Sequence, residues 1–180
     1  MERYVALLRG INVGGKNKVP MADLRDALGD AGYESVRTYI QSGNVVFASA
    51  RSRKGLEEEV EQVLEARFGF PIPVVIRSRD ELAAVVYDAP DGFGARPDLY
   101  HSDVLFLKGP LTAERVMEIV RLRDGVDQAW PGAGVVYFAR LSAQRQRSLM
   151  SRIVSTPEYR LMTIRSWSTT TTLLDLIDQE

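Results

Sequence analysis

The feature of this sequence that most constrains its fold is the order in which its apolar segments follow one another. In the first half, four segments are typical of strands and two place apolar side chains on one helical face. The strand-like segments are 4–8, 36–40, 45–48 and 73–76, and the helical ones are 21–28 and 56–68. The resulting order, strand, helix, strand, strand, helix, strand, defines the βαββαβ unit of ferredoxin-like folds.

The same order recurs in the second half of the chain. Strand-like segments lie at 104–107, 126–130, 135–139 and 161–164, helical ones at 116–120 and 142–154, and a closing helical segment at 173–177. NVVFA (44–48) and GVVYFA (134–139) occupy equivalent places, each after a turn. The pattern therefore predicts an α+β protein with two ferredoxin-like βαββαβ halves, each with a mainly antiparallel sheet.

Local signals predict where the segments begin and where the halves divide. Ser52 and Ser142 are placed to cap helices, and Ser78 with Glu81 forms a capping box that opens a short helix. A Pro/Gly-rich linker follows that helix. We therefore expect a first half at 1–77, a helix and linker at 78–99, and a second half with a C-terminal helix at 100–180.

Composition limits the chemistry available to the chain. The 180 residues include no cysteine and one histidine, His101, which excludes thiolate nucleophiles, thiolate metal sites and sites built from several imidazoles. The net charge of −1 gives no overall attraction to nucleic acid or membrane surfaces. No cofactor, metal or membrane partner is indicated, and the N-terminus lacks a secretory signal, so we expect a cytoplasmic protein.

One loop carries the strongest candidate for a site. GINVGGKN (10–17) lies between the first strand and the first helix, and it is similar to a phosphate-binding P-loop. A P-loop needs Ser or Thr after the lysine to hold Mg²⁺, whereas Asn17 follows Lys16 here. No strand ends in the acidic residue that a nucleotide hydrolase also needs. The alternatives are a more general anion-binding loop and a flexible turn.

Topology predicts the surroundings of this loop. In a βαββαβ unit the first two strands run in the same direction, so the exit of the first strand and the turn after the second, QSGN (41–44), lie at one end of the sheet. Glycine amides and a helix N-terminus there favour an anion. The candidate ligand-binding residues are Arg9, Asn12, Gly14, Gly15, Lys16, Asn17, Lys18, Gln41, Ser42 and Asn44.

These residues support a binding protein for a small anionic ligand or partner at the strand-1/helix-1 loop. The alternative is an enzyme acting on a phosphorylated or carboxylated small molecule, with Lys16 and Arg9 stabilising charge. RNA binding is less favoured, because SGNVVFA offers one aromatic residue where RNA-reading sheets carry several.

Two further features extend the list of candidates. Arg165 and Trp167 alternate at the predicted end of the last strand, where both would point to one face and could stack a ring; a core tryptophan beside an ion-paired arginine is the competing interpretation. The region 140–165 is rich in arginine, which is typical of a solvated helix face.

The segments ALLRGINVGGKNKVPMADLR (6–25) and TYIQSGNVVF (38–47) resemble the bacterial Domain of Unknown Function 1697 family. The resemblance covers about residues 3–77 and returns at TIRSWSTTTTLLDL (163–176), where Ser166 and Ser168 stand in place of the usual Asn. The stretch 139–154 departs from the family pattern. The resemblance implies a soluble bacterial protein of two ferredoxin-like halves, and it implies no established activity.

Overall fold

The computed structural model describes residues 1–179 and divides the chain into two compact units. The first comprises Met1–Ala83 together with the chain from Leu173 onward, and the second comprises Ala84–Thr172. The division therefore falls inside two helices, α3 (Arg79–Tyr87) and α5 (Trp167–Asp178).

The first unit has the expected βαββαβ order. Its elements are β1 (Glu2–Leu8), α1 (Met21–Asp30), β2 (Glu34–Tyr39), β3 (Asn44–Ser49), α2 (Leu56–Phe68) and β4 (Val74–Ser78). The strands form one sheet in the order β2-β3-β1-β4, and each neighbouring pair is antiparallel. This is the strand order of a ferredoxin-like unit.

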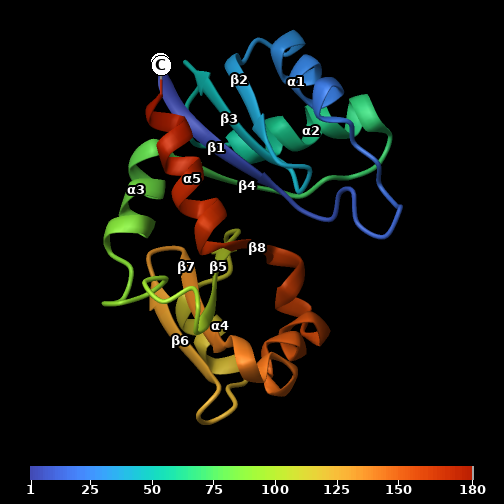
Figure 1. The fold of residues 1–180 in the computed structure, drawn as a ribbon. Coiled ribbons are helices and arrows are strands. Elements are labelled where there is room, and N and C mark those ends of the chain that lie inside the picture. Colours follow the sequence, from blue (N-terminus) through green and yellow to red (C-terminus); the bar gives the residue numbers. More distant parts are fainter. Residues whose placement is uncertain (180) are drawn as a thin grey trace. The chain divides into compact units, whose positions relative to one another are not determined.

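The helices α1 and α2 cover the same face of the first sheet (Figure 1). Alternate strand residues point to this face, so Tyr4, Ala6 and Leu8 of β1 are buried with Leu24 of α1 and Leu64 of α2. The core therefore follows from the match between a strand period of two and a helix period of 3.6.

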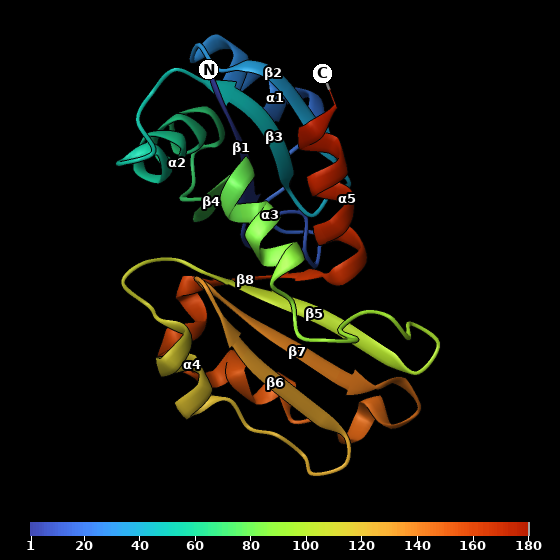
Figure 2. The same ribbon diagram turned by 90° about the vertical axis from the view of Figure 1, so that its left-hand side faces the viewer.

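The second unit repeats the sheet. Its strands are β5 (Tyr100–Leu107), β6 (Asp127–Gly132), β7 (Val135–Leu141) and β8 (Met162–Ser166), in the antiparallel order β6-β7-β5-β8. One face packs on α4 (Ala113–Ile119) and on two short 3₁₀ segments, η2 (Met150–Ser155) and η3 (Pro157–Leu161) (Figure 2). A third 3₁₀ segment, η1 (Ser142–Arg147), precedes them and has no buried residue. The predicted α+β class with two ferredoxin-like halves is confirmed.

The second helix of this unit is the main correction. A continuous helix was expected over 142–154, but the chain forms the 3₁₀ segments instead. Hydroxyl groups compete there for the backbone: Ser148 Oγ accepts the amide of Met150 at 3.2 Å, and Thr156 Oγ1 donates to the carbonyl of Ile153 at 2.7 Å. Pro157 then holds Thr156 in an extended conformation.

The helix caps were predicted with mixed success. The capping box is confirmed, since the Ser78 amide donates to Glu81 Oε2 at 2.8 Å and the Glu81 amide donates to Ser78 Oγ at 3.2 Å. Ser52 does not cap α2, because Gly55 in a left-handed conformation precedes that helix. Ser52 Oγ instead accepts the amide of Lys54 within the preceding turn.

The C-terminal helix is held by three arginines of the first unit, two from its sheet and one from the start of α3. Arg3 donates to the carbonyl of Ile177 at 3.0 Å and Arg37 to that of Gln179 at 2.9 Å, while Arg79 makes a two-pronged ion pair with Asp178. Cations are favoured at a helix C-terminus, where carbonyl groups lack helical partners. Among the helices of residues 1–179, none combines the length and apolar character needed to cross a membrane.

Candidate functional site

The Gly-rich loop after β1 is closed by the side chain of Asn12. Its amide nitrogen donates to the carbonyls of Val19, at 3.0 Å, and Gln41, at 2.9 Å, and its oxygen accepts the amide of Val19 at 2.8 Å. One side chain therefore joins both ends of the loop to the turn after β2. Asn12 has a φ of 54°, a left-handed conformation that asparagine tolerates better than most residues.

The turn QSGN lies beside this loop, as the topology predicts. The Leu8 amide donates to the carbonyl of Gly43 at 2.8 Å. Gly43 has a φ of +87°, and a Cβ there would lie 2.7 Å from Ile11 Cδ1, so the close approach requires glycine. Asn44 is fully buried and donates to the Tyr39 carbonyl at 2.9 Å.

The loop, the turn and the start of α1 enclose a concavity of about 310 Å³. The lining residues are Asn12, Gly15, Lys18, Val19, Pro20, Met21 and Gln41. Pro20 is the residue before α1, and no side chain caps that helix, so the first amides of α1 are left for another acceptor. Lys18 is the one ionised side chain among the lining residues.

The residues predicted for the loop site have different roles in the structure. Asn12, Gly15, Lys18 and Gln41 line the concavity, whereas Asn17 donates to the Gly10 carbonyl at 3.1 Å and Asn44 closes the turn. Gly14 and Lys16 are exposed, and Lys16 donates its amide to the Val13 carbonyl. The remaining candidates, Arg9 and Ser42, are half-buried and exposed respectively, outside the lining.

Arg165 and Trp167 belong to the second unit and do not share a strand. β8 ends at Ser166, and Trp167 begins α5, so the expected alternation on one strand is wrong. The ring of Trp167 packs edge-on against Phe93, with 5.1 Å between centroids. Arg165 is buried, and desolvation lowers the pKa of its guanidinium to about 10.

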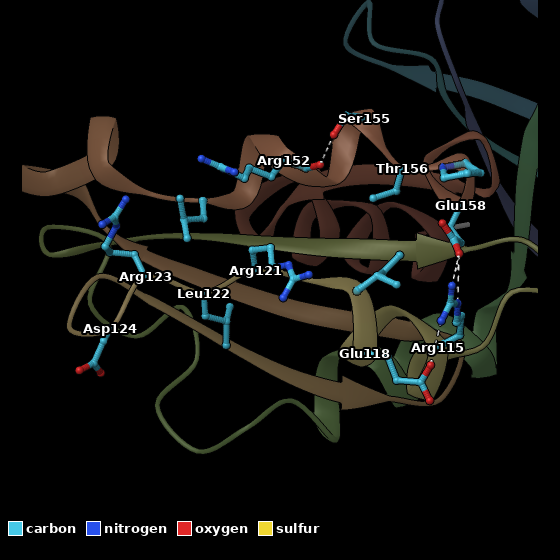
Figure 3. Close-up of a pocket in the computed structure, with 13 residues that line it drawn as sticks. Arg115, Glu118, Arg121, Leu122, Arg123, Asp124, Arg152, Ser155, Thr156 and Glu158 are labelled. Carbon is cyan, nitrogen blue, oxygen red and sulfur yellow. Dashed lines mark hydrogen bonds and ion pairs between the residues drawn. The ribbon is translucent and has the colours of Figure 1, made fainter.

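A second, larger hollow was not foreseen from the sequence. An open cleft of about 890 Å³ runs between the end of α4 with the chain after it and the 3₁₀ segments η2 and η3 (Figure 3). Arg121 and Arg152 come from opposite walls, and among residues 1–179 their guanidinium groups make no hydrogen bond or ion pair. Arg115 bridges to Glu158 at 2.8 Å.

The lining of this cleft carries charges of both signs. Four arginines line it, and so do Glu118, Asp124 and Glu158. Long exposed side chains of both signs provide weak, salt-sensitive attraction to an anion. The concavity beside Asn12 combines a lysine with backbone donors held in place and has no carboxylate in its lining. Its lining therefore carries less opposing charge than the lining of the cleft does.

A buried carboxylate lies at the edge of the second core. Asp103 is 6% exposed and has His101 Nε2 at 3.3 Å and Arg140 Nη2 at 3.8 Å. Burial raises the pKa of the Asp103 carboxyl above its ordinary value of 3.8, and the neighbouring cations offset only part of that rise. The native state therefore holds this proton more tightly than the unfolded state does.

This shift gives a pH-dependent stability with a definite sign. The contribution of Asp103 is largest below pH 3.8 and decreases as the pH rises towards its folded pKa, because the charged form is costly to bury. The unfolding free energy is measured by urea titration, and the value for Asp103→Asn is subtracted from that of the wild type. This difference should fall as the pH rises from about 3 towards neutrality.

Asp98→Asn is the matched control for this measurement. The hydrogen bond from Arg96 lowers the pKa of the exposed Asp98 carboxyl, so wild type minus this variant should rise with pH over the same range. A rising or flat difference for Asp103→Asn would contradict the assigned shift.

Comparisons with known proteins place the chain in a family. The family described as a protein of unknown function, DUF1697, matches residues 1–137, so the match ends just before the divergent stretch 139–154. A conserved bacterial protein from Streptococcus pneumoniae, SP0830, has a similar solved structure, with a TM-score of 0.86 and 30% sequence identity. That similarity covers 98% of this chain and 99% of the other. No curated protein matches the chain. The chain belongs to the DUF1697 family of proteins of unknown function.

Proposed function

We propose that this protein binds a small anionic ligand, phosphorylated or carboxylated, in the concavity after β1, and that it acts in the cytoplasm. The observation that supports the proposal is the set of three hydrogen bonds made by the Asn12 side chain. They hold the loop against Gln41 and Val19. Because the loop is already ordered, the donors that make no hydrogen bond within it can bind a ligand without the entropic cost of ordering the loop.

The donors available to a ligand come from three places. Lys18 supplies the charge, the uncapped N-terminus of α1 supplies amides at Met21, and Gly15 supplies an amide that makes no hydrogen bond within residues 1–179. The amides of Asn12, Lys16 and Val19 are already donated within the loop. Oriented amides and a positive helix end favour an anion over a neutral ligand.

One group opposes an anion. Asp23 lies in the first turn of α1, where its negative charge interacts favourably with the helix dipole and competes with a ligand for the same field. The site is therefore suited to moderate affinity, and its charge balance can be tested in both directions.

Calorimetric titration with inorganic phosphate at low ionic strength tests the proposal. We expect Lys18→Gln to weaken phosphate binding about tenfold, because a charge-assisted contact is lost. Lys54→Gln, which removes an exposed lysine outside the lining, is the matched control and should leave binding unchanged.

Asp23→Asn provides the opposite change in charge. It should tighten phosphate binding by about two- to fivefold, since the helix terminus no longer faces a fixed carboxylate. Absence of phosphate binding to the wild type, or equal weakening by Lys18→Gln and Lys54→Gln, would contradict the proposal.

A further inference from the structure

The face of the second sheet opposite to α4 has a floor of small side chains. Ser102 of β5 pairs directly with Ala139 of β7, and Ala139 pairs with Gln128 of β6. Residues that face each other across antiparallel strands point to the same side of a sheet. These three therefore form one row across three strands, with two small side chains beside an amide.

Larger aromatic side chains border this row. Tyr100 precedes Ser102 by two positions and Trp130 follows Gln128 by two, so both lie on the same face as the floor. Phe93, from the linker, packs edge-on against Trp130 with 6.0 Å between centroids. Together they enclose a cavity of about 310 Å³.

The floor of the cavity carries a hydroxyl group without a partner. Ser102 is 8% exposed, its Oγ is shielded from solvent, and it makes no hydrogen bond among the described residues. A buried hydroxyl without a partner is destabilising, because it has lost its hydrogen bonds to water without gaining others. A group that enters the cavity and exchanges a hydrogen bond with Ser102 recovers that cost.

The geometry points to a binding site for a planar heteroaromatic ring of nucleobase type, carried as a free base or a nucleoside. The ring stands edge-on to the floor between the aromatic side chains, so that its polar edge meets the Ser102 hydroxyl and the Gln128 amide. This site is separate from the loop concavity and does not depend on anion binding there.

The distribution of polar groups distinguishes this ligand from a sugar. Among the lining residues on the sheet, hydrogen-bonding groups of Ser102 and Gln128 lie in one row, and apolar or aromatic groups surround them. A ring with donors and acceptors along one edge matches that row. A sugar has hydroxyl groups all around its ring and would leave most of them unpaired.

The rim of the cavity disfavours a phosphate. Asp91 is an exposed lining residue, and the charge of Arg96 is neutralised by Asp98, whose carboxylate accepts two hydrogen bonds from it at 3.1 and 3.2 Å. The net charge at the rim is therefore negative. A cavity of this volume, near the lower end of the range for ligand sites, suits a nucleoside.

Titration of the full-length protein with adenosine tests the inference, with the indole N–H signal of Trp130 as the readout. We expect a saturable shift with adenosine, several-fold weaker binding of adenosine monophosphate, and no shift with methyl glucoside. Asp91→Asn should reduce the difference between the nucleoside and the nucleotide. Ser102→Ala and Gln128→Ala should each weaken adenosine binding by about two- to tenfold.

Controls separate recognition from damage to the fold. Gln128 has an exposed side chain, so its replacement tests the edge contact even where Ser102→Ala disturbs the sheet. Ser168→Ala, which changes an exposed serine outside the lining, should leave adenosine binding unchanged. No saturable shift with adenosine, binding of methyl glucoside, equal binding of nucleotide and nucleoside, or unchanged affinity in both Ser102→Ala and Gln128→Ala would overturn the inference.

Discussion

Replacement of Gly94 by alanine is expected to destabilise the second unit by about 2–5 kcal/mol. Gly94 has a φ of +73°, and a Cβ there would lie 2.0 Å from Cδ1 of Trp167. The indole cannot move aside freely, because it packs against Phe93. Strained backbone and overpacking therefore act together at one position.

Gly92→Ala is the matched control. Gly92 has a φ of +78°, but no heavy atom lies within 4 Å of its added Cβ, so only the backbone strain applies and the cost should be about 1 kcal/mol. Both tryptophans, Trp130 and Trp167, lie in the second unit, so urea unfolding followed by their fluorescence reports on it. Equal losses in the two variants would contradict the contact between Gly94 and Trp167.

The second large effect is expected for Asn12→Ala. This change removes three hydrogen bonds and places alanine at a φ of 54°, which together should cost about 2–4 kcal/mol. The Val19 amide loses its acceptor and should exchange its proton faster with solvent. Phosphate binding should weaken more than tenfold, because the loop is no longer held in place.

Asn17→Ala is the control that distinguishes loss of the Asn12 hydrogen bonds from the strain of placing alanine at a positive φ. Asn17 has a similar φ of 51°, but its side chain makes one hydrogen bond, to the Gly10 carbonyl. We expect Asn17→Ala to lose about half as much stability as Asn12→Ala and to leave the exchange rate of the Val19 amide proton unchanged. Slow exchange at Val19 in Asn12→Ala, measured by amide hydrogen exchange, would show that Asn12 does not hold the loop.

The two sheets could be predicted from the sequence because the apolar pattern that specifies a strand is local and periodic. Alternating apolar residues specify which face of a strand is buried, and the βαββαβ order then fixes the neighbours of each strand. The same topology predicts that the segments around Asn12 and Gln41 lie together, and the hydrogen bond between these residues confirms that they adjoin.

The 3₁₀ segments were not predictable in the same way. Met150 and Ile153 have the spacing of a helical face, and both are buried as that spacing requires. The α-helix fails because Ser148, Thr156 and Pro157 change the backbone hydrogen bonds, which apolar spacing does not report. The positions of these hydroxyl residues are the signal that could have revealed it.

Two parts of the candidate sites needed three-dimensional information. Asn12 was predicted as a ligand contact, whereas its side chain also closes the loop, and that task depends on where Val19 and Gln41 lie. The cavity over Ser102 depends on the register that aligns it with Ala139 and on the folding of the linker around Phe93. The pattern of a strand alone does not show which small residues become neighbours.

Backbone amide mapping of the isotope-labelled protein with inorganic phosphate tests the central claim most directly. Binding in the loop concavity predicts saturable shifts centred on Gly15, Lys18 and Met21, with smaller shifts at the amides of Lys16 and Val19, which already donate within the loop. The shifts should be lost in Asn12→Ala and retained in Lys54→Gln. If phosphate causes no shifts in the loop, or only shifts in the cleft around Arg121 and Arg152, the proposed binding in the loop concavity is contradicted.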